Sequence, residues 1–150
     1  MEEKLNEIIF YQLEAAIKSY RQFAQRNIQT AGYDITIDQW LVLKKLKEDP
    51  SITQQQLASQ VFKDFASITR IVELLVRKKY LQRNNHPVDR RRFVLTIQPK
   101  GLDVLSSVQN VINKNRKKAL KDVSEKEIKN LQSVLQRIVM NTAQDQAAAE

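Results

Sequence analysis

The chain has 150 residues, 42% of them hydrophobic, which is enough for one domain with a buried core. It has no cysteine and one histidine, His86, which excludes disulfide frameworks, thiolate nucleophiles and cysteine-based metal sites. No apolar run is long enough to span a membrane, and the acidic start is unlike a secretion signal. We therefore expect a cytoplasmic protein with no membrane partner.

The net charge of +8 is unevenly distributed. Residues 63–100 hold ten basic and three acidic residues, whereas the rest of the chain is nearly neutral. A basic block on an otherwise balanced chain is typical of a surface that faces a polyanion.

The first half of the chain shows three helical segments. Apolar residues recur at three- and four-residue steps from Leu5 to Ala24, which predicts a long first helix. Two Ser/Thr-x-x-Glu/Gln patterns then mark helix starts, beginning at Thr36 and at Thr53. The first of these helices should end before Pro50, and the second should be short, over residues 54–61.

The second half adds a further helix, a hairpin and two long helices. After a turn at residues 62–64, apolar spacing predicts a helix that ends near Lys79. Residues 80–83 and 92–97 are typical of two strands around a polar loop. A helix should then start at Pro99, another should start after Ser124, and residues 144–150 should form a frayed tail.

This order predicts a mainly α fold with a small β-hairpin wing. A short helix, a tight turn and a longer helix form a helix-turn-helix unit, and a basic hairpin after it makes the unit winged.

The sequence resembles the MarR-type family of winged-helix transcription regulators over essentially its whole length. The matching parts are Leu57-Ala58, residues 67–72, residues 77–81 and, most specifically, the wing's Asp-x-Arg at residues 89–91. The resemblance implies a single domain, 1–150, with a winged lobe at 35–100 and helical dimerisation arms at 1–31 and 101–143.

Three positions depart from the family pattern. Phe62 stands in the turn where the family often has glycine, and Lys79 or Tyr80 replaces a glycine before the wing. Ile97-Gln98 replaces the common Leu-Thr before the long arm, which removes a good helix cap.

The helix after the turn is expected to read DNA. If it buries Ile68, Ile71, Val72 and Leu75, its other face presents polar and basic residues, and an α-helix fits the major groove. Arg70 is the predicted base reader. The predicted supporting contacts to bases or phosphates are Ser67, Thr69, Lys63 and Arg77. The alternative is a plain solvated helix face.

In the wing, residues 90–92 form a run of three arginines. The resemblance implies that Asp89 orients an arginine entering the minor groove, so we predict that Arg91 enters it while Arg90 and Arg92 meet phosphates. The alternative is a solvated charged loop. His86 is interpreted as a turn or phosphate-facing residue rather than a metal ligand.

Family members often bind small aromatic or phenolic molecules where the arms join the lobe. Five aromatic residues are the candidates for such a site here: Tyr11, Tyr20, Phe23, Tyr33 and Trp40. The alternative is that these side chains belong to the core. The apolar stripes of the terminal helices would form a homodimer, or alternatively pack within the chain.

The leading hypothesis is a dimeric, sequence-specific regulator of double-stranded DNA, more often a repressor in this family, acting at a pseudo-palindromic operator. The alternative is a nonspecific architectural or RNA-binding protein that uses the same basic surface. No catalytic constellation, metal site or cofactor motif is present, so we expect neither an enzyme nor a cofactor.

Overall fold

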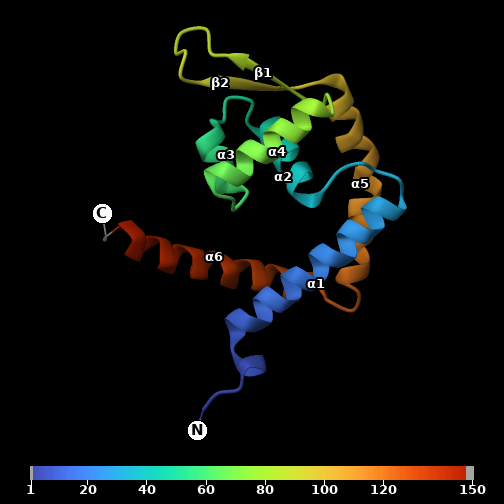
Figure 1. Ribbon diagram of the computed structural model, residues 1–150. Coiled ribbons are helices and arrows are strands. Elements are labelled where there is room, and N and C mark those ends of the chain that lie inside the picture. Colours follow the sequence, from blue (N-terminus) through green and yellow to red (C-terminus); the bar gives the residue numbers. More distant parts are fainter. Residues whose placement is uncertain (1, 148–150) are drawn as a thin grey trace. The chain divides into compact units, whose positions relative to one another are not determined.

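The computed structural model describes the backbone of residues 2–147 and side chains up to residue 143. Within that range the chain is mainly α-helical with one antiparallel hairpin (Figure 1), as predicted. The elements are η1 (Leu5–Glu7), α1 (Ile9–Thr30), α2 (Ile37–Glu48), α3 (Gln54–Gln60), α4 (Phe65–Arg77), β1 (Leu81–Asn85), β2 (Phe93–Ile97), α5 (Pro99–Ala119) and α6 (Glu125–Ala147).

Both predicted helix starts in the first half are capping boxes. The Thr36 hydroxyl accepts from the Gln39 amide at 3.1 Å, and the Gln39 side chain accepts from the Thr36 amide at 3.2 Å. Thr53 and Gln56 make the same reciprocal pair at 3.1 and 3.0 Å. Each box provides partners for amides that an N-terminus leaves unpaired.

The chain divides into two compact units, residues 1–115 and 116–150. The first unit has one apolar core, to which α1, α2, α3, α4, the hairpin and α5 all contribute. Its fully buried members include Ile28, Val42, Leu43, Leu57, Ile68, Val72, Leu75, Leu81 and Val108. This core fixes α4 against α2 and α3, and so determines which face of α4 remains outside.

At two positions where the family pattern has glycine, this chain has another residue but keeps the left-handed backbone conformation that favours glycine. Phe62 and Lys79 both have φ of 62°, in the left-handed region that disfavours side chains. The turn at Phe62 still closes tightly, because the Lys63 amide donates to the Ala58 carbonyl at 2.9 Å. The substitution at this position has therefore not widened the turn.

The hairpin register runs from Leu81 opposite Ile97 to Asn85 opposite Phe93. The first strand begins one residue later than predicted and extends two residues further. Tyr80 lies outside β1 because its amide donates to the Leu75 carbonyl at 2.9 Å and so closes the end of α4. Its carbonyl accepts from the Gln98 amide at 2.9 Å, which continues the register of the hairpin by one position.

The start of α5 lies against the base of the wing. A Cβ on Gly101 would overlap the Tyr80 carbonyl oxygen and approach Ile97 Cγ2 to 3.0 Å. Only glycine therefore permits this approach of helix and strand.

In the second unit, Ser124 caps α6 as predicted: its hydroxyl accepts from the Glu127 amide at 3.2 Å, and the Glu127 carboxylate accepts from the Ser124 amide at 2.8 Å. The prediction of a frayed tail from residue 144 is wrong for residues 144–147, whose backbone continues α6. Residues 148–150 lie outside the described residues.

Candidate nucleic-acid interface

The longer helix of the helix-turn-helix unit, α4, begins at a charged cap. The Asp64 carboxylate accepts from the Ser67 amide at 2.7 Å. Hydrogen bonds from the Ser67 backbone and side chain hold the pKa of Asp64 below its ordinary value. The cap was not predicted. Its signal, an Asp three residues before Ser67, was present in the sequence.

The exposed face of α4 is the one expected from the sequence. Ile68, Val72 and Leu75 are buried, whereas Arg70 and Arg77 are exposed. Ser67 is half-buried at the first turn, beside amides that have no partner within the helix. The outer face of α4 therefore combines a guanidinium with a helix N-terminus, a combination that suits anions.

Thr69 differs from the prediction because its hydroxyl is already engaged. It donates to the Phe65 carbonyl at 2.8 Å and accepts from the Gln54 side chain at 2.9 Å. Thr69 thus links α4 to the start of α3.

Lys63, predicted to contact a phosphate, is also paired within the lobe. Its Nζ lies 3.1 Å from Asp38 Oδ2, while Arg21 Nη2 lies 2.5 Å from Asp38 Oδ1. Partial burial acts to raise the pKa of Asp38, but the hydrogen bonds and positive charges of Arg21 and Lys63 outweigh it and lower the pKa. These three residues are far apart in sequence, so no local pattern indicated this contact.

The wing loop is a turn held together by two side chains. His86 Nδ1 accepts from the amides of Val88 and Asp89, at 3.2 and 3.0 Å, so the histidine supports the turn. Asp89 accepts from the Arg91 backbone amide at 3.0 Å. Among the described residues Asp89 therefore fixes the backbone of the turn, and its role in orienting a guanidinium on DNA stays a prediction.

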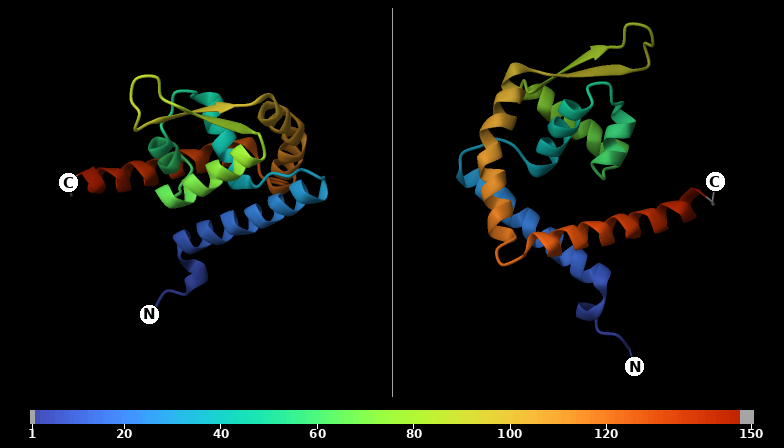
Figure 2. Two further views of the ribbon diagram at one scale, coloured as in Figure 1. Left: turned by 45° about the horizontal axis from the view of Figure 1, so that its top comes forward. Right: turned by 180° about the vertical axis from the view of Figure 1, so that it is seen from behind.

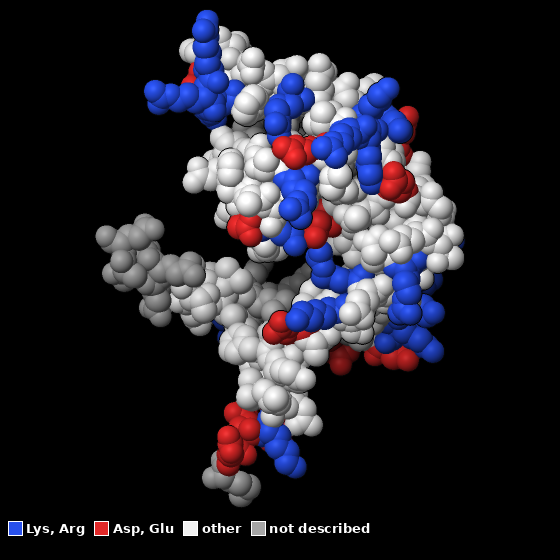
Figure 3. All heavy atoms as spheres, in the orientation of Figure 1, with Lys and Arg blue, Asp and Glu red and all other residues white. Residues whose placement is uncertain are grey.

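The loop projects beyond α3 and α4 in both views of Figure 2, with Arg90, Arg91 and Arg92 exposed. Figure 3 shows lysine and arginine atoms gathered at the wing tip. The wing therefore presents a concentrated positive charge at the edge of the lobe.

A hollow of about 440 Å³ lies between α3, α4 and the wing. Phe65 and Thr69 of α4 line it together with Arg91 and Arg92 of the wing loop. Arg83, which was not predicted as a site residue, also lines it and lies 5.1 Å from the centre of the Phe93 ring. Helix α4 and the wing thus border one shared space.

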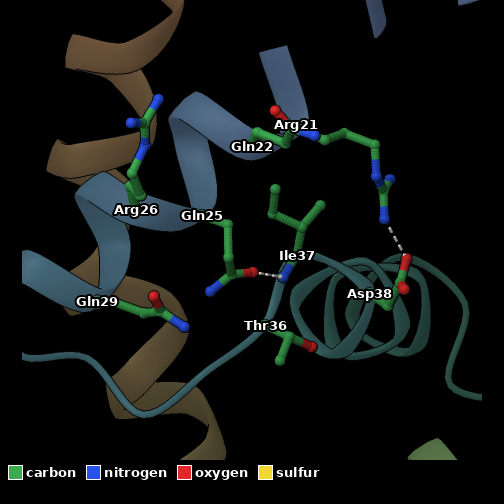
Figure 4. A pocket seen from close by; sticks show the side chains of 8 residues that line it. All are labelled: Arg21, Gln22, Gln25, Arg26, Gln29, Thr36, Ile37 and Asp38. Atoms are coloured by element: carbon green, nitrogen blue, oxygen red, sulfur yellow. Dashed lines mark hydrogen bonds and ion pairs between the residues drawn. The ribbon is translucent and has the colours of Figure 1, made fainter. Parts of the chain in front are cut away.

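A second cavity, of about 590 Å³, lies where α1 meets the start of α2 (Figure 4). It is lined by Arg21, Gln22, Gln25, Arg26, Gln29, Thr36, Ile37 and Asp38. We refer to it as the arm cavity. Across it the Gln25 side chain accepts from the Ile37 amide at 2.9 Å.

None of the five aromatic candidates lines the arm cavity. Tyr11 is exposed, Tyr20 and Phe23 are half-buried, and Trp40 packs against the core. The Tyr33 hydroxyl donates to the Ser107 carbonyl at 3.0 Å. These side chains therefore do not gather in this space.

Within the described residues no group of His, Asp or Glu side chains has the arrangement of a metal site. None of the helices found there is long and apolar enough to cross a membrane.

The short helix α3, the tight turn, the exposed face of α4 and the basic hairpin together define a winged helix-turn-helix protein. The model of the MarR family matches residues 35–93, from the residue before the first capping box to the second wing strand. Over those residues, which include the helix-turn-helix unit and most of the hairpin, the chain is similar to the MarR family of transcriptional regulators.

Individual similar proteins agree with this assignment. A Thauera aromatica protein named as a transcriptional regulatory protein for the hcr operon is 29% identical over 106 residues, covering 71% of this chain and 63% of that protein. The crystal structure of a probable transcriptional regulator from Pseudomonas aeruginosa is 28% identical, with a TM-score of 0.80 and coverage of 90% and 99%.

A third similar protein extends the likeness in fold. It is Bordetella bronchiseptica BpsR, whose structure concerns regulation of DNA binding by 6-hydroxynicotinic acid. It has a TM-score of 0.83 at 18% identity, over 93% of this chain and 98% of that one.

Proposed function

We propose that this chain is a dimeric, sequence-specific DNA-binding regulator that represses transcription from a pseudo-palindromic operator. The observation that carries the proposal is the hollow shared by α4 and the wing loop. Because Phe65 and Thr69 border the same space as Arg91 and Arg92, one duplex can touch the recognition helix and the wing together. A wing on the far side of the lobe would not allow this.

In the major groove, Arg70 is the proposed base reader. Its side chain is exposed on the outer face of α4, and arginine can donate two parallel hydrogen bonds to guanine. Ser67 at the helix N-terminus is the proposed phosphate or base contact, and Arg77 is placed further along the same helix. Thr69 acts mainly by joining α4 to α3.

In the wing, Arg91 is proposed to enter the minor groove, while Arg90 and Arg92 contact phosphates. Narrow minor grooves concentrate negative potential, which attracts a guanidinium. Asp89 contributes by fixing the backbone of the turn through the Arg91 amide. The arginine side chains themselves stay free to adapt to the groove.

Dimerisation is proposed to use the apolar residues of the terminal helices. Leu5, Ile9, Phe10 and Ile17 in the first helical segments are 52–64% exposed. In α6, Leu131 and Val139 are 51% and 64% exposed. Such apolar stripes fit a two-fold interface, which would place two recognition helices on successive turns of a duplex.

Release of DNA by a small aromatic or phenolic effector is the regulatory part of the proposal. The regulation of BpsR by 6-hydroxynicotinic acid supports it at the level of a protein of the same fold. The arm cavity offers space for a small molecule at the junction of arm and lobe. The predicted ligand residues lie outside that cavity and remain a prediction: Tyr11, Tyr20, Phe23, Tyr33 and Trp40.

A nonspecific architectural or RNA-binding protein would use the same arginines. Selection of bound duplexes from a random pool separates the two functions, because a specific dimer recovers a two-fold symmetric motif. Arg70→Ala should weaken binding to that motif by about 1–3 kcal/mol and binding to scrambled duplex much less. Equal loss on both duplexes, or recovery of no motif, would favour the nonspecific function.

A further inference from the structure

Three charged side chains connect the first arm to the helix-turn-helix turn. Asp38, at the start of α2, binds Arg21 of α1 through one carboxylate oxygen at 2.5 Å and Lys63 of the turn through the other at 3.1 Å. All three are partly buried, with side-chain exposures of 36% for Arg21, 28% for Asp38 and 32% for Lys63. The cluster therefore loses less of its strength to solvent than a fully exposed pair.

Asp38 also borders two spaces. On one side it lines the arm cavity. On the other it lines a hollow of about 300 Å³ together with Lys63, Ser67 and Arg70. That second hollow lies beside the first turn of α4, and its two cations, Lys63 and Arg70, favour an anion. The Asp38 carboxylate thus occupies one wall of a space that could take a DNA phosphate.

We propose that Asp38 is a positioning residue that withholds Lys63 from the DNA backbone by binding it in place of a phosphate. The inference rests on the proposed DNA-binding function. It concerns how strongly the protein binds rather than which sequence it reads. Lys63 can bind either the carboxylate or a phosphate, whereas Arg21 binds the other oxygen of the same carboxylate.

The lowered pKa of Asp38 agrees with the geometry, because the hydrogen bonds and positive charges of Arg21 and Lys63 outweigh the opposing effect of burial. A second acid–lysine pair in the same lobe, Asp34 with Lys78 at 2.8 Å, provides a comparison. Lys78 follows the C-terminal end of α4, and it does not line the hollow beside Ser67 and Arg70.

The test is Asp38→Asn in the full-length chain, with binding to a poly(dA-dT) duplex measured over a series of salt concentrations. One added phosphate contact per chain, two per dimer, should steepen the slope of log K against log salt by about 1.8 and tighten binding roughly sixtyfold at about 0.1 M salt. Asp34→Asn removes the same charge and should leave the slope unchanged.

Two further variants separate the release of Lys63 from a loosened arm. Arg21→Met breaks the same contact between arm and α2 but leaves Lys63 bound to Asp38, so its slope should not steepen. Asp38→Asn in a Lys63→Met background should lose the gain in slope. A steeper slope in Arg21→Met, or a gain that survives without Lys63, would overturn the inference.

If Asp38→Asn does not fold, the single variant Lys63→Met provides the test. Lys63→Met alone should leave the slope unchanged, because Lys63 makes no phosphate contact in the wild type. A slope reduced by about 1.8, or about 0.9 for each chain of the dimer, would show that Lys63 already contacts DNA. Failure of the wild-type chain to bind any duplex would instead contradict the proposed function itself.

Discussion

The winged lobe and α6 use apolar residues in opposite ways. In the lobe, Leu57, Ile68 and Val72 are completely buried, whereas none of the described side chains of α6 is buried. Both regions have helical periodicity, yet only the lobe buries its apolar face within the chain. The comparison indicates that α3, α4 and the wing are stabilised by the core of the lobe, while α6 carries an apolar face suited to a partner.

The largest effect is expected from Leu131→Glu, which tests whether the apolar face of α6 binds a partner. If the apolar face of α6 is a dimer interface, a buried carboxylate there should dissociate the dimer. Loss of the second half-site should weaken operator binding by about a hundredfold. Sedimentation measures the dissociation, and fluorescence anisotropy measures the affinity.

The matched control is Ser133→Glu, which places the same charge on the opposite face of α6. It should leave both the dimer and the affinity intact. A Leu131→Glu protein that remains dimeric would show that this face serves another purpose.

A smaller effect is expected in the wing, where a substitution should weaken DNA binding without changing the stability of the fold. Arg91→Ala should weaken binding by about five- to tenfold for each half-site, because it removes one cationic contact from each chain of the dimer. Its melting temperature should not change, since the side chain is exposed. Asp89→Ala, which loosens only the turn, should have the weaker effect in the same anisotropy assay; an equal loss would assign Asp89 a more direct part.

The smallest expected effect lies within the lobe. Phe62 has φ of 62° and an 89% exposed side chain, so Phe62→Gly relieves backbone strain and loses little packing. The free energy of unfolding should rise by about 0.5–1 kcal/mol in denaturant titrations. Phe62→Ala keeps the Cβ and should show no such gain; equal stability of the two variants would place the strain elsewhere.

Local features of the fold were accessible from the sequence. The capping boxes at Thr36, Thr53 and Ser124 mark helix starts in the structure, because the interacting residues are three positions apart. The exposed face of α4 followed from apolar periodicity. The start of β1 did not, because the Tyr80 amide is bound to the Leu75 carbonyl at the end of α4, and strand composition does not indicate that contact.

The candidate site was only partly predictable for the same reason. Arg70 and Arg91 are exposed, as a charge pattern indicates. The engagement of Lys63 by Asp38 joins residues 25 positions apart, and Asp38 is shared with Arg21 from another helix. Pairing of this kind depends on tertiary packing, and spacing along one element carries no signal of it.

The missing side chain at Gly101 has a mechanical consequence. The first turn of α5 leaves no room for a Cβ beside the Tyr80 carbonyl, which also accepts from the Gln98 amide. Close-packed contacts transmit displacement instead of absorbing it. The start of α5 and the base of the hairpin are therefore expected to move as one rigid unit. A rotation of α5 would then displace the tip of the wing.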